Sequence, residues 1–259
     1  MSRTKRFIFI GGAEGSGTTL LLRLLSSPNC CVSLGGLAQK LPDFPVCKQL
    51  ADAFIAANNL VWDRKLSFEE QDDGRSKWHV AMDHILAAPA FAQTSHYLFK
   101  RSFPFRVTAL PSDRYTPDLW DILELWPDVR ILVIYRDPRA ATYSAFRRKF
   151  DSDLRRLAVV CSEQLTWLAG QVRAIGSERI RIVSYARLCA APGAVLEPVA
   201  NFCDIPYDQL SDAIGGEKFD TNADSRWSHE LTKANSNWLD RFFNCRRLQQ
   251  WEILIAGSN

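Results

Sequence analysis

The chain has few of the features that mark metal sites, membrane spans or polyanion binders. Its seven cysteines include no C-x-x-C pair, which argues against a zinc site and favours reduced, buried thiols. A net charge of +3 is too small for a general nucleic-acid or membrane-surface binder. Only four apolar residues separate the basic N-terminus from the first glycines, too few for a signal peptide or a membrane span. From these absences we expect a cytoplasmic protein with no nucleic-acid partner, no membrane span and no metal.

Short apolar runs alternate with longer helical patterns along all 259 residues. This alternation is typical of a parallel sheet with helices on both faces. Neither a repeat nor a Pro/Gly/Ser-rich linker divides the chain, so we predict a single α/β domain, residues 1–259, with a P-loop-like parallel sheet flanked by helices. The expected strands are 7–10, 97–100, 130–135 and 179–185. The expected helices are 18–26, 50–58, 76–88, 116–125, 140–150, 162–175, 194–203 and one near 238–247.

A glycine-rich turn in "RFIFIGGAEGSGTTLLLRLL" joins the first strand to the first helix. Its spacing fits G-x-x-x-x-G-K-[ST], except that a threonine replaces the lysine. Backbone N–H groups and the helix dipole form an anion site there, and glycines let the backbone wrap a phosphate. Without the lysine the γ-phosphate loses its clamp, which argues against a kinase or ATPase; the alternative is a tight turn without a ligand. The candidate phosphate contacts are Gly12, Gly15, Ser16, Gly17, Thr18 and Thr19.

A second motif, "ILVIYRDPRAATYSAFRRKF", begins with a buried strand that ends just before Arg136. Pro138 then opens a helix that carries Ser144 and Arg148. In open α/β sheets, ligands bind beside the carboxyl ends of the strands. An arginine and a hydroxyl group there can hold a second phosphate through charge-assisted hydrogen bonds, worth about 1.5–3 kcal/mol each. The alternative for this basic stretch is a solvated helix face.

Together the two motifs resemble the sulfotransferase family that uses 3′-phosphoadenosine 5′-phosphosulfate (PAPS). In that family a lysine-free G-[ST]-T loop grips the 5′-phosphosulfate. An arginine and a serine eight residues later grip the 3′-phosphate, which is the spacing of Arg136 and Ser144. The string R-D-P-R-A-A-T-Y-S-A-F-R-R-K is especially similar to the protein-tyrosine sulfotransferase branch, in which a further arginine, matching Arg148, meets the same phosphate.

Three further segments are similar to the family in the same order. "FKRSFP" resembles its K-x-x-x-P strand end and implies that Lys100 lies near the transferring sulfonate as the catalytic residue. "IVSYARL" implies that Tyr185 lines the nucleotide, and "SRWSHELTKANSNW" implies contacts from Arg226 and Lys233. The segment from about 216 to 259 would cover the nucleotide as a loop and a helix. The resemblance implies PAPS as donor, 3′-phosphoadenosine 5′-phosphate (PAP) as product, and an acceptor hydroxyl or amine of unknown identity.

The chain also departs from this family pattern. The family usually has Lys or Arg just before S-G-T, where this chain has Gly15, preceded by Glu14, whose charge would repel a phosphosulfate unless it points away. The general base is absent from its expected positions; the candidates are His79, Asp83, His84 and the acidic residues of 69–73, which could equally be surface residues. Two alternatives stay open: a non-catalytic PAP- or PAPS-binding relative, and a P-loop kinase with an unusual loop.

Overall fold

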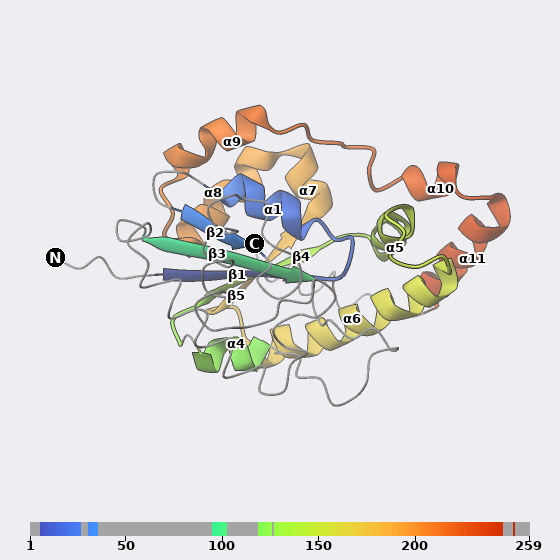
Figure 1. The fold of residues 1–259 in the computed structure, drawn as a ribbon, viewed down its shortest axis with the longest axis horizontal. Coiled ribbons are helices and arrows are strands. Elements are labelled where there is room, and N and C mark those ends of the chain that lie inside the picture. The colour runs from blue at the N-terminus through green and yellow to red at the C-terminus, as the bar shows by residue number, and fades with distance from the viewer. Residues whose placement is uncertain are drawn as a thin grey trace, which may run out of the picture.

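The computed structural model describes residues 6–26, 31–35, 95–102, 119–125, 127–245 and Trp251, and is built around a twisted central sheet (Figure 1). The sheet has five strands in the order β2-β3-β1-β4-β5, and each neighbouring pair is parallel. The expected α/β fold, a parallel sheet flanked by helices, is confirmed. The strands are β1 (Arg6–Gly12), β2 (Cys31–Gly35), β3 (His96–Ser102), β4 (Arg130–Tyr135) and β5 (Ile180–Ser184).

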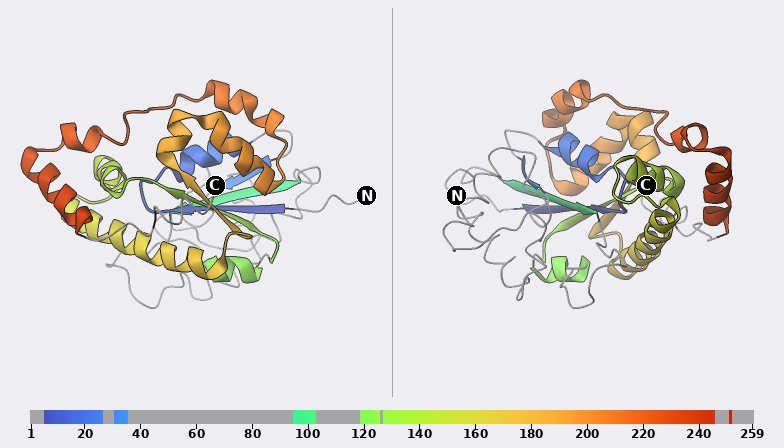
Figure 2. Two further views of the ribbon diagram at one scale, coloured as in Figure 1. Left: turned by 180° about the vertical axis from the view of Figure 1, so that it is seen from behind. Right: turned by 45° about the vertical axis from the view of Figure 1, so that its right-hand side comes forward.

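Helices cover both faces of the sheet and its carboxyl-terminal edge (Figures 1 and 2). One face carries α1 (Thr18–Leu25), α7 (Tyr185–Ala190), α8 (Pro192–Cys203), the 3₁₀ helix η3 (Tyr207–Leu210) and α9 (Ser211–Gly216). The other face carries α4 (Leu119–Leu125) and α6 (Leu154–Ile175). Beyond the strand ends, together at the right of Figure 1, lie α5 (Pro138–Arg147), α10 (Arg226–Glu230) and α11 (Lys233–Asn244).

Each face of the sheet packs into its own hydrophobic core, because side chains alternate along a strand. Ile8 and Ile10 of β1 point into the core under α1 and α8, whereas Phe9 points into the core against α6. Burying a large apolar side chain contributes about 1.5–3 kcal/mol, so both faces hold their helices firmly. Trp251 is fully buried in the second core and stacks on Tyr135 with ring centroids 5.1 Å apart.

Strand order places the ligand-binding edge at β1 and β4. The chain leaves β1 toward α1 on one face, and leaves β4 toward α5 and α6 on the other side. Neighbouring strands whose connections diverge in this way leave a crevice at their carboxyl ends, where ligands of open α/β sheets bind. The glycine turn follows β1 and Arg136 follows β4, so both sequence motifs reach this one point.

Several expected elements begin or end elsewhere in the structure. Strand β2 was not expected at all. Tyr185 opens α7 instead of ending β5, because the Ser184 side chain accepts a hydrogen bond from the Arg187 N–H and caps the helix. Helix α6 begins at Leu154, eight residues earlier than expected, because the Asp153 side chain caps it.

The C-terminal region is more regular than its polar composition suggested. Thr232 caps α11, which therefore begins at Lys233 rather than near Trp238. The expected helices 50–58 and 76–88 lie outside the described residues. Within the described ranges no helix is long and apolar enough to cross a membrane, and no cluster of His, Cys, Asp or Glu is arranged to hold a metal ion.

The buried thiols give a test of the packing. Cys161 of α6 and Cys203 of α8 are buried, and burial raises the pKa of each thiol to about 12, whereas Cys245 is exposed. Only a thiolate reacts with an alkylating reagent, so at pH 8 we expect Cys245 to be labelled and the other two to be protected until the protein is denatured. Peptide mass spectrometry after timed alkylation measures this. Native labelling of Cys161 as fast as Cys245 would contradict the packing of α6.

Candidate functional site

The turn after β1 has a backbone path that requires glycine. Gly15 and Gly17 have φ angles of 82° and 102°, a region that other residues rarely adopt. A Cβ at Gly12 would lie 2.4 Å from the Ser16 Oγ and 2.7 Å from the Ile134 carbonyl oxygen. Gly17 is the N-cap of α1, and no side chain of the described residues caps the helix there. The first N–H groups of α1 therefore have no side-chain acceptor and can bind an anion.

The close approach of α5 also requires glycine at position 15. A Cβ at this position would lie 2.3 Å from the carbonyl oxygen of Ala141, which is backbone and cannot turn aside. A lysine or arginine, which the family resemblance would place here, does not fit unless the turn or α5 moves. The departure at Gly15 is therefore built into the packing of this chain.

Lys100 supplies a positive charge to the same turn from β3. Its position is paired in register with Ile10 of β1, so it stands at the carboxyl end of the sheet beside the turn. Its ammonium Nζ donates a hydrogen bond of 2.8 Å to the Thr19 Oγ1 in the first turn of α1. The structure thus brings together two residues that the sequence had assigned to the same phosphosulfate.

Arg136 is the most buried charged side chain of the site, with 7% of it exposed. Its Nη1 donates to the Gly15 carbonyl oxygen over 3.1 Å and its Nη2 to the Ala223 carbonyl oxygen over 2.8 Å. Its Nε donates to the Asp224 carboxylate over 2.6 Å. The face of its guanidinium lies 4.2 Å from the ring centre of Tyr185. One arginine therefore joins the glycine turn, α7 and the C-terminal segment.

A pocket of about 350 Å³ opens beside Arg136. It contains five residues that the sequence had assigned to the nucleotide, and four of its ten lining residues are arginines against one aspartate. Lys233 is exposed in the first turn of α11 and does not line this pocket. The lining residues are Arg136, Ala140, Tyr143, Ser144, Arg147, Arg148, Tyr185, Asp220, Ala223 and Arg226.

The negative charge of Glu14 beside the turn is balanced by Arg148. Its carboxylate accepts a hydrogen bond of 3.2 Å from the Arg148 Nη2, while its backbone N–H donates to the Gln164 Oε1 over 3.1 Å. Gln164 belongs to α6 and is 4% exposed, so it fixes the turn from below. Glu14 therefore points toward α5, and it shares Arg148 with any anion that would bind there.

Tyr185 packs directly on the glycine turn. A Cβ at Gly17 would lie 2.6 Å from its ring, so the tyrosine can pack here only because residue 17 is glycine. Burial raises the pKa of the Tyr185 hydroxyl to about 12, although Arg136 lowers it. The hydroxyl therefore stays protonated at neutral pH and can donate a hydrogen bond.

The carboxylates of the site were missed by sequence reasoning. Burial raises the pKa of Asp224, although its partner Arg136 lowers it. Asp220 pairs with Arg226, and Glu230 accepts a hydrogen bond from the Tyr143 hydroxyl. These acids come from a polar segment about ninety residues after Arg136. Asp220 and Asp224 lie outside the segments that resembled the family, and Glu230 lies in one of them without a predicted role. The proposed bases His79, Asp83 and His84, and the acidic stretch 69–73, lie outside the described residues.

Comparison with known proteins decides the family. Residues 7–209 match the model of the sulfotransferase family. The chain belongs to this family. It is 25% identical to a putative protein-tyrosine sulfotransferase of Caenorhabditis briggsae, over 93% of this chain and 84% of the relative. It is 26% identical to the protein-tyrosine sulfotransferase of Drosophila melanogaster, over 99% of this chain and 49% of the relative, and so spans about half of that protein.

Solved structures agree with the fold. The sulfotransferase domain from the curacin biosynthetic pathway superposes with a TM-score of 0.59 at 16% identity, covering 94% of this chain and 99% of that domain. A mouse sulfotransferase complexed with PAP superposes with a TM-score of 0.53 at 10% identity, covering 94% of this chain and 84% of that chain. At these identities the likeness establishes the architecture of this sulfotransferase.

The contact between Gly15 and α5 can be tested by substitution. We expect Gly15→Ala to destabilise the protein by about 1–3 kcal/mol, because alanine is strained at this φ and its Cβ meets the Ala141 carbonyl oxygen. Gly170→Ala is the matched control: it lies within α6 with open space around it, and should stabilise by about 0.5–1 kcal/mol. Urea unfolding followed by circular dichroism measures both. Equal stability of the two variants would show that the turn does not need glycine at this position.

Proposed function

We propose that this protein transfers a sulfonate group from PAPS to an acceptor hydroxyl or amine. The observation that carries the proposal is that Arg136 joins two anion-binding features. On one side lies the glycine turn with Lys100, and on the other lies the basic pocket with Ser144. PAPS carries two separate anionic groups, the 5′-phosphosulfate and the 3′-phosphate. A ligand with this charge pattern suits a site with two such features.

The residues present fit such a ligand. A Cβ at Gly12, Gly15 or Gly17 would clash with neighbouring protein atoms, so the turn keeps a glycine backbone that can wrap a phosphate. The Ser16 Oγ is buried with no hydrogen-bond partner among the described residues. A buried hydroxyl without a partner is costly, and an anion in the turn would relieve that cost. In this proposal the phosphosulfate contacts are Gly12, Gly15, Ser16, Gly17, Thr18, Thr19 and Lys100. The 3′-phosphate contacts are Arg136, Ser144 and Arg148, and the nucleotide is enclosed by Tyr185 and Arg226. Lys233, which lies outside the pocket, takes no contact in this proposal.

PAPS, when bound, supplies a sulfonate group on a good leaving phosphate. The chain's contribution is to hold that phosphate and to stabilise negative charge that develops on it. Lys100 and the N-terminus of α1 meet at Thr19, so a cation and a helix dipole act at the same place. With no side chain at Gly15, we assign the role of the catalytic cation to Lys100. This scheme requires no metal ion.

The proposal does not specify the identity of the acceptor. The relatives named above are protein-tyrosine sulfotransferases, which makes tyrosine peptides the first acceptors to test. Sugars, phenols and lipid alcohols offer the same hydroxyl chemistry. A non-catalytic PAP-binding role is the second candidate, and the packing that excludes a cation at Gly15 favours it. Family membership and the lysine-free turn both argue against the kinase alternative.

Arg136→Ala tests the assignment of the 3′-phosphate. Losing this guanidinium removes charge-assisted hydrogen bonds, so PAP should bind about 10- to 100-fold more weakly. AMP lacks the 3′-phosphate, so its affinity should fall far less than that of PAP, and retained AMP binding also shows that the variant is folded. Calorimetric titration with both nucleotides measures this. Equal losses for PAP and AMP would contradict the assignment.

Lys100→Met tests the catalytic step. The wild type, incubated with PAPS and a panel of tyrosine peptides, sugars, phenols and lipid alcohols, should release PAP when the right acceptor is present, also in excess EDTA. Lys100→Met should lower that rate by about 10²–10³, because the variant loses a preorganised cation. Arg173→Met, which removes an exposed cation in the last turn of α6, is the control and should keep the full rate. Tight PAP binding without turnover of any acceptor would favour the non-catalytic role.

A further inference from the structure

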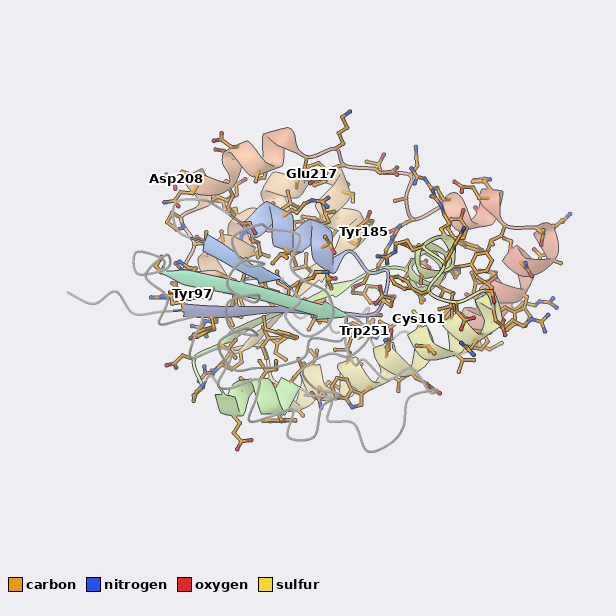
Figure 3. The ribbon with its side chains drawn as sticks, viewed as in Figure 1. Tyr97, Cys161, Tyr185, Asp208, Glu217 and Trp251 are labelled. Atoms are coloured by element: carbon orange, nitrogen blue, oxygen red, sulfur yellow. The ribbon has the colours of Figure 1, made fainter. Side chains whose placement is uncertain are left out.

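The segment 217–225, here called the strap, links α9 to α10 and passes over the carboxyl-terminal edge of the sheet (Figure 1). Three carboxylates of the strap each pair with an arginine elsewhere. Glu217 accepts hydrogen bonds of 3.1 and 2.9 Å from Arg23 of α1, and lies on the same side of the sheet as Tyr185 (Figure 3). Asp220 pairs with Arg226, and Asp224 with Arg136. The strap is therefore fastened by charge at three points.

The third fastening lies inside the proposed nucleotide site. Asp224 accepts from the Arg136 Nε over 2.6 Å, and the neighbouring Ala223 carbonyl oxygen accepts from the Nη2 over 2.8 Å. One edge of the guanidinium is thus taken up by the strap. A phosphate that sought the same two donors would meet the carboxylate at the position it needs. Two anions at one guanidinium edge repel each other strongly in a partly buried site.

The charged form of Asp224 loses hydration in this short contact with Arg136. Burial raises the pKa of Asp224 more than the pairing with Arg136 lowers it, so the charged carboxylate is less stable here than in water. A phosphate monoester carries about 1.5 to 2 negative charges and three acceptor oxygens near neutral pH. With its greater charge it can compete with a single carboxylate for this arginine.

We propose that Asp224 is an internal competitor of the nucleotide's 3′-phosphate for Arg136. The strap holds the arginine in the conformation of the structure, and nucleotide binding exchanges the carboxylate for the phosphate. Asp224 therefore lowers the affinity for PAP and leaves that for AMP untouched. This inference rests on the proposed function.

Asp224→Asn removes the charge and keeps an oxygen that can accept from Arg136. We expect the variant to bind PAP about tenfold more tightly than the wild type, a usual size for coupling of this kind, and AMP equally well. Glu217→Gln is the matched control, since it loosens the same strap at Arg23 without touching Arg136. It should leave PAP affinity unchanged. Calorimetric titration of the full chain with PAP and AMP measures all three proteins, and thermal melting verifies that each is folded.

The outcomes of this experiment distinguish a failure of the inference from a failure of the proposed function. Weaker or unchanged PAP binding by Asp224→Asn, in a wild type that prefers PAP over AMP, overturns the competitor role and leaves the donor assignment standing. Tighter binding by Glu217→Gln as well would trace the effect to strap mobility and also overturn it. A wild type that does not prefer PAP over AMP rejects the proposed function, and the inference with it. Asp224→Ala gives the same comparison if the asparagine variant does not fold.

Discussion

The arrangement of the site depends on one buried arginine. Arg136 stands where β4 ends, and its guanidinium is satisfied by the glycine turn, by the C-terminal segment and by the ring of Tyr185. A buried charge is tolerated only when its donors are paired, so each of these three segments is held at the position that satisfies it. The parallel sheet fixes the backbone position of Arg136, and the hydrogen bonds of its guanidinium fix the positions of the glycine turn and of the C-terminal segment. The carboxyl-terminal edge of the sheet is therefore organised in large part by the contacts of one buried charge.

The glycine turn lacks the cation that the family resemblance would place at Gly15, but it keeps the strand, the helix and the lysine around it. A side chain at Gly15 would need room that the Ala141 carbonyl oxygen of α5 occupies in this chain. The charge of Lys100 reaches the turn from β3, through Thr19. Glu14, which looked unfavourable beside an anion, is balanced by Arg148 and anchored through Gln164. Charge near the turn is thus distributed over neighbouring elements.

Local patterns predicted the parts of the fold and site that depend on nearby sequence. Four buried strands were visible as apolar runs, and the turn and the Arg136–Ser144 spacing led to the family that residues 7–209 match. Strand β2 was missed, and the other failures depended on capping or on distant partners. Asp153 extends α6 by eight residues through one side chain, a signal that hydrophobic periodicity does not contain. Asp224 could not be predicted as a site residue, because its role depends on its burial and on its contact with Arg136, 88 residues away in the sequence. The residue assignments within the site remain predictions.

The contact between Gly15 and Ala141 has a further consequence. It packs the backbone of the glycine turn against α5, which carries Ser144 and is followed by Arg148, with no side chain in between. In the proposed function the turn and α5 hold the two anionic groups of one ligand, so this main-chain contact would set the distance between them. Ligands whose two negative groups are spaced differently would then be excluded by length alone.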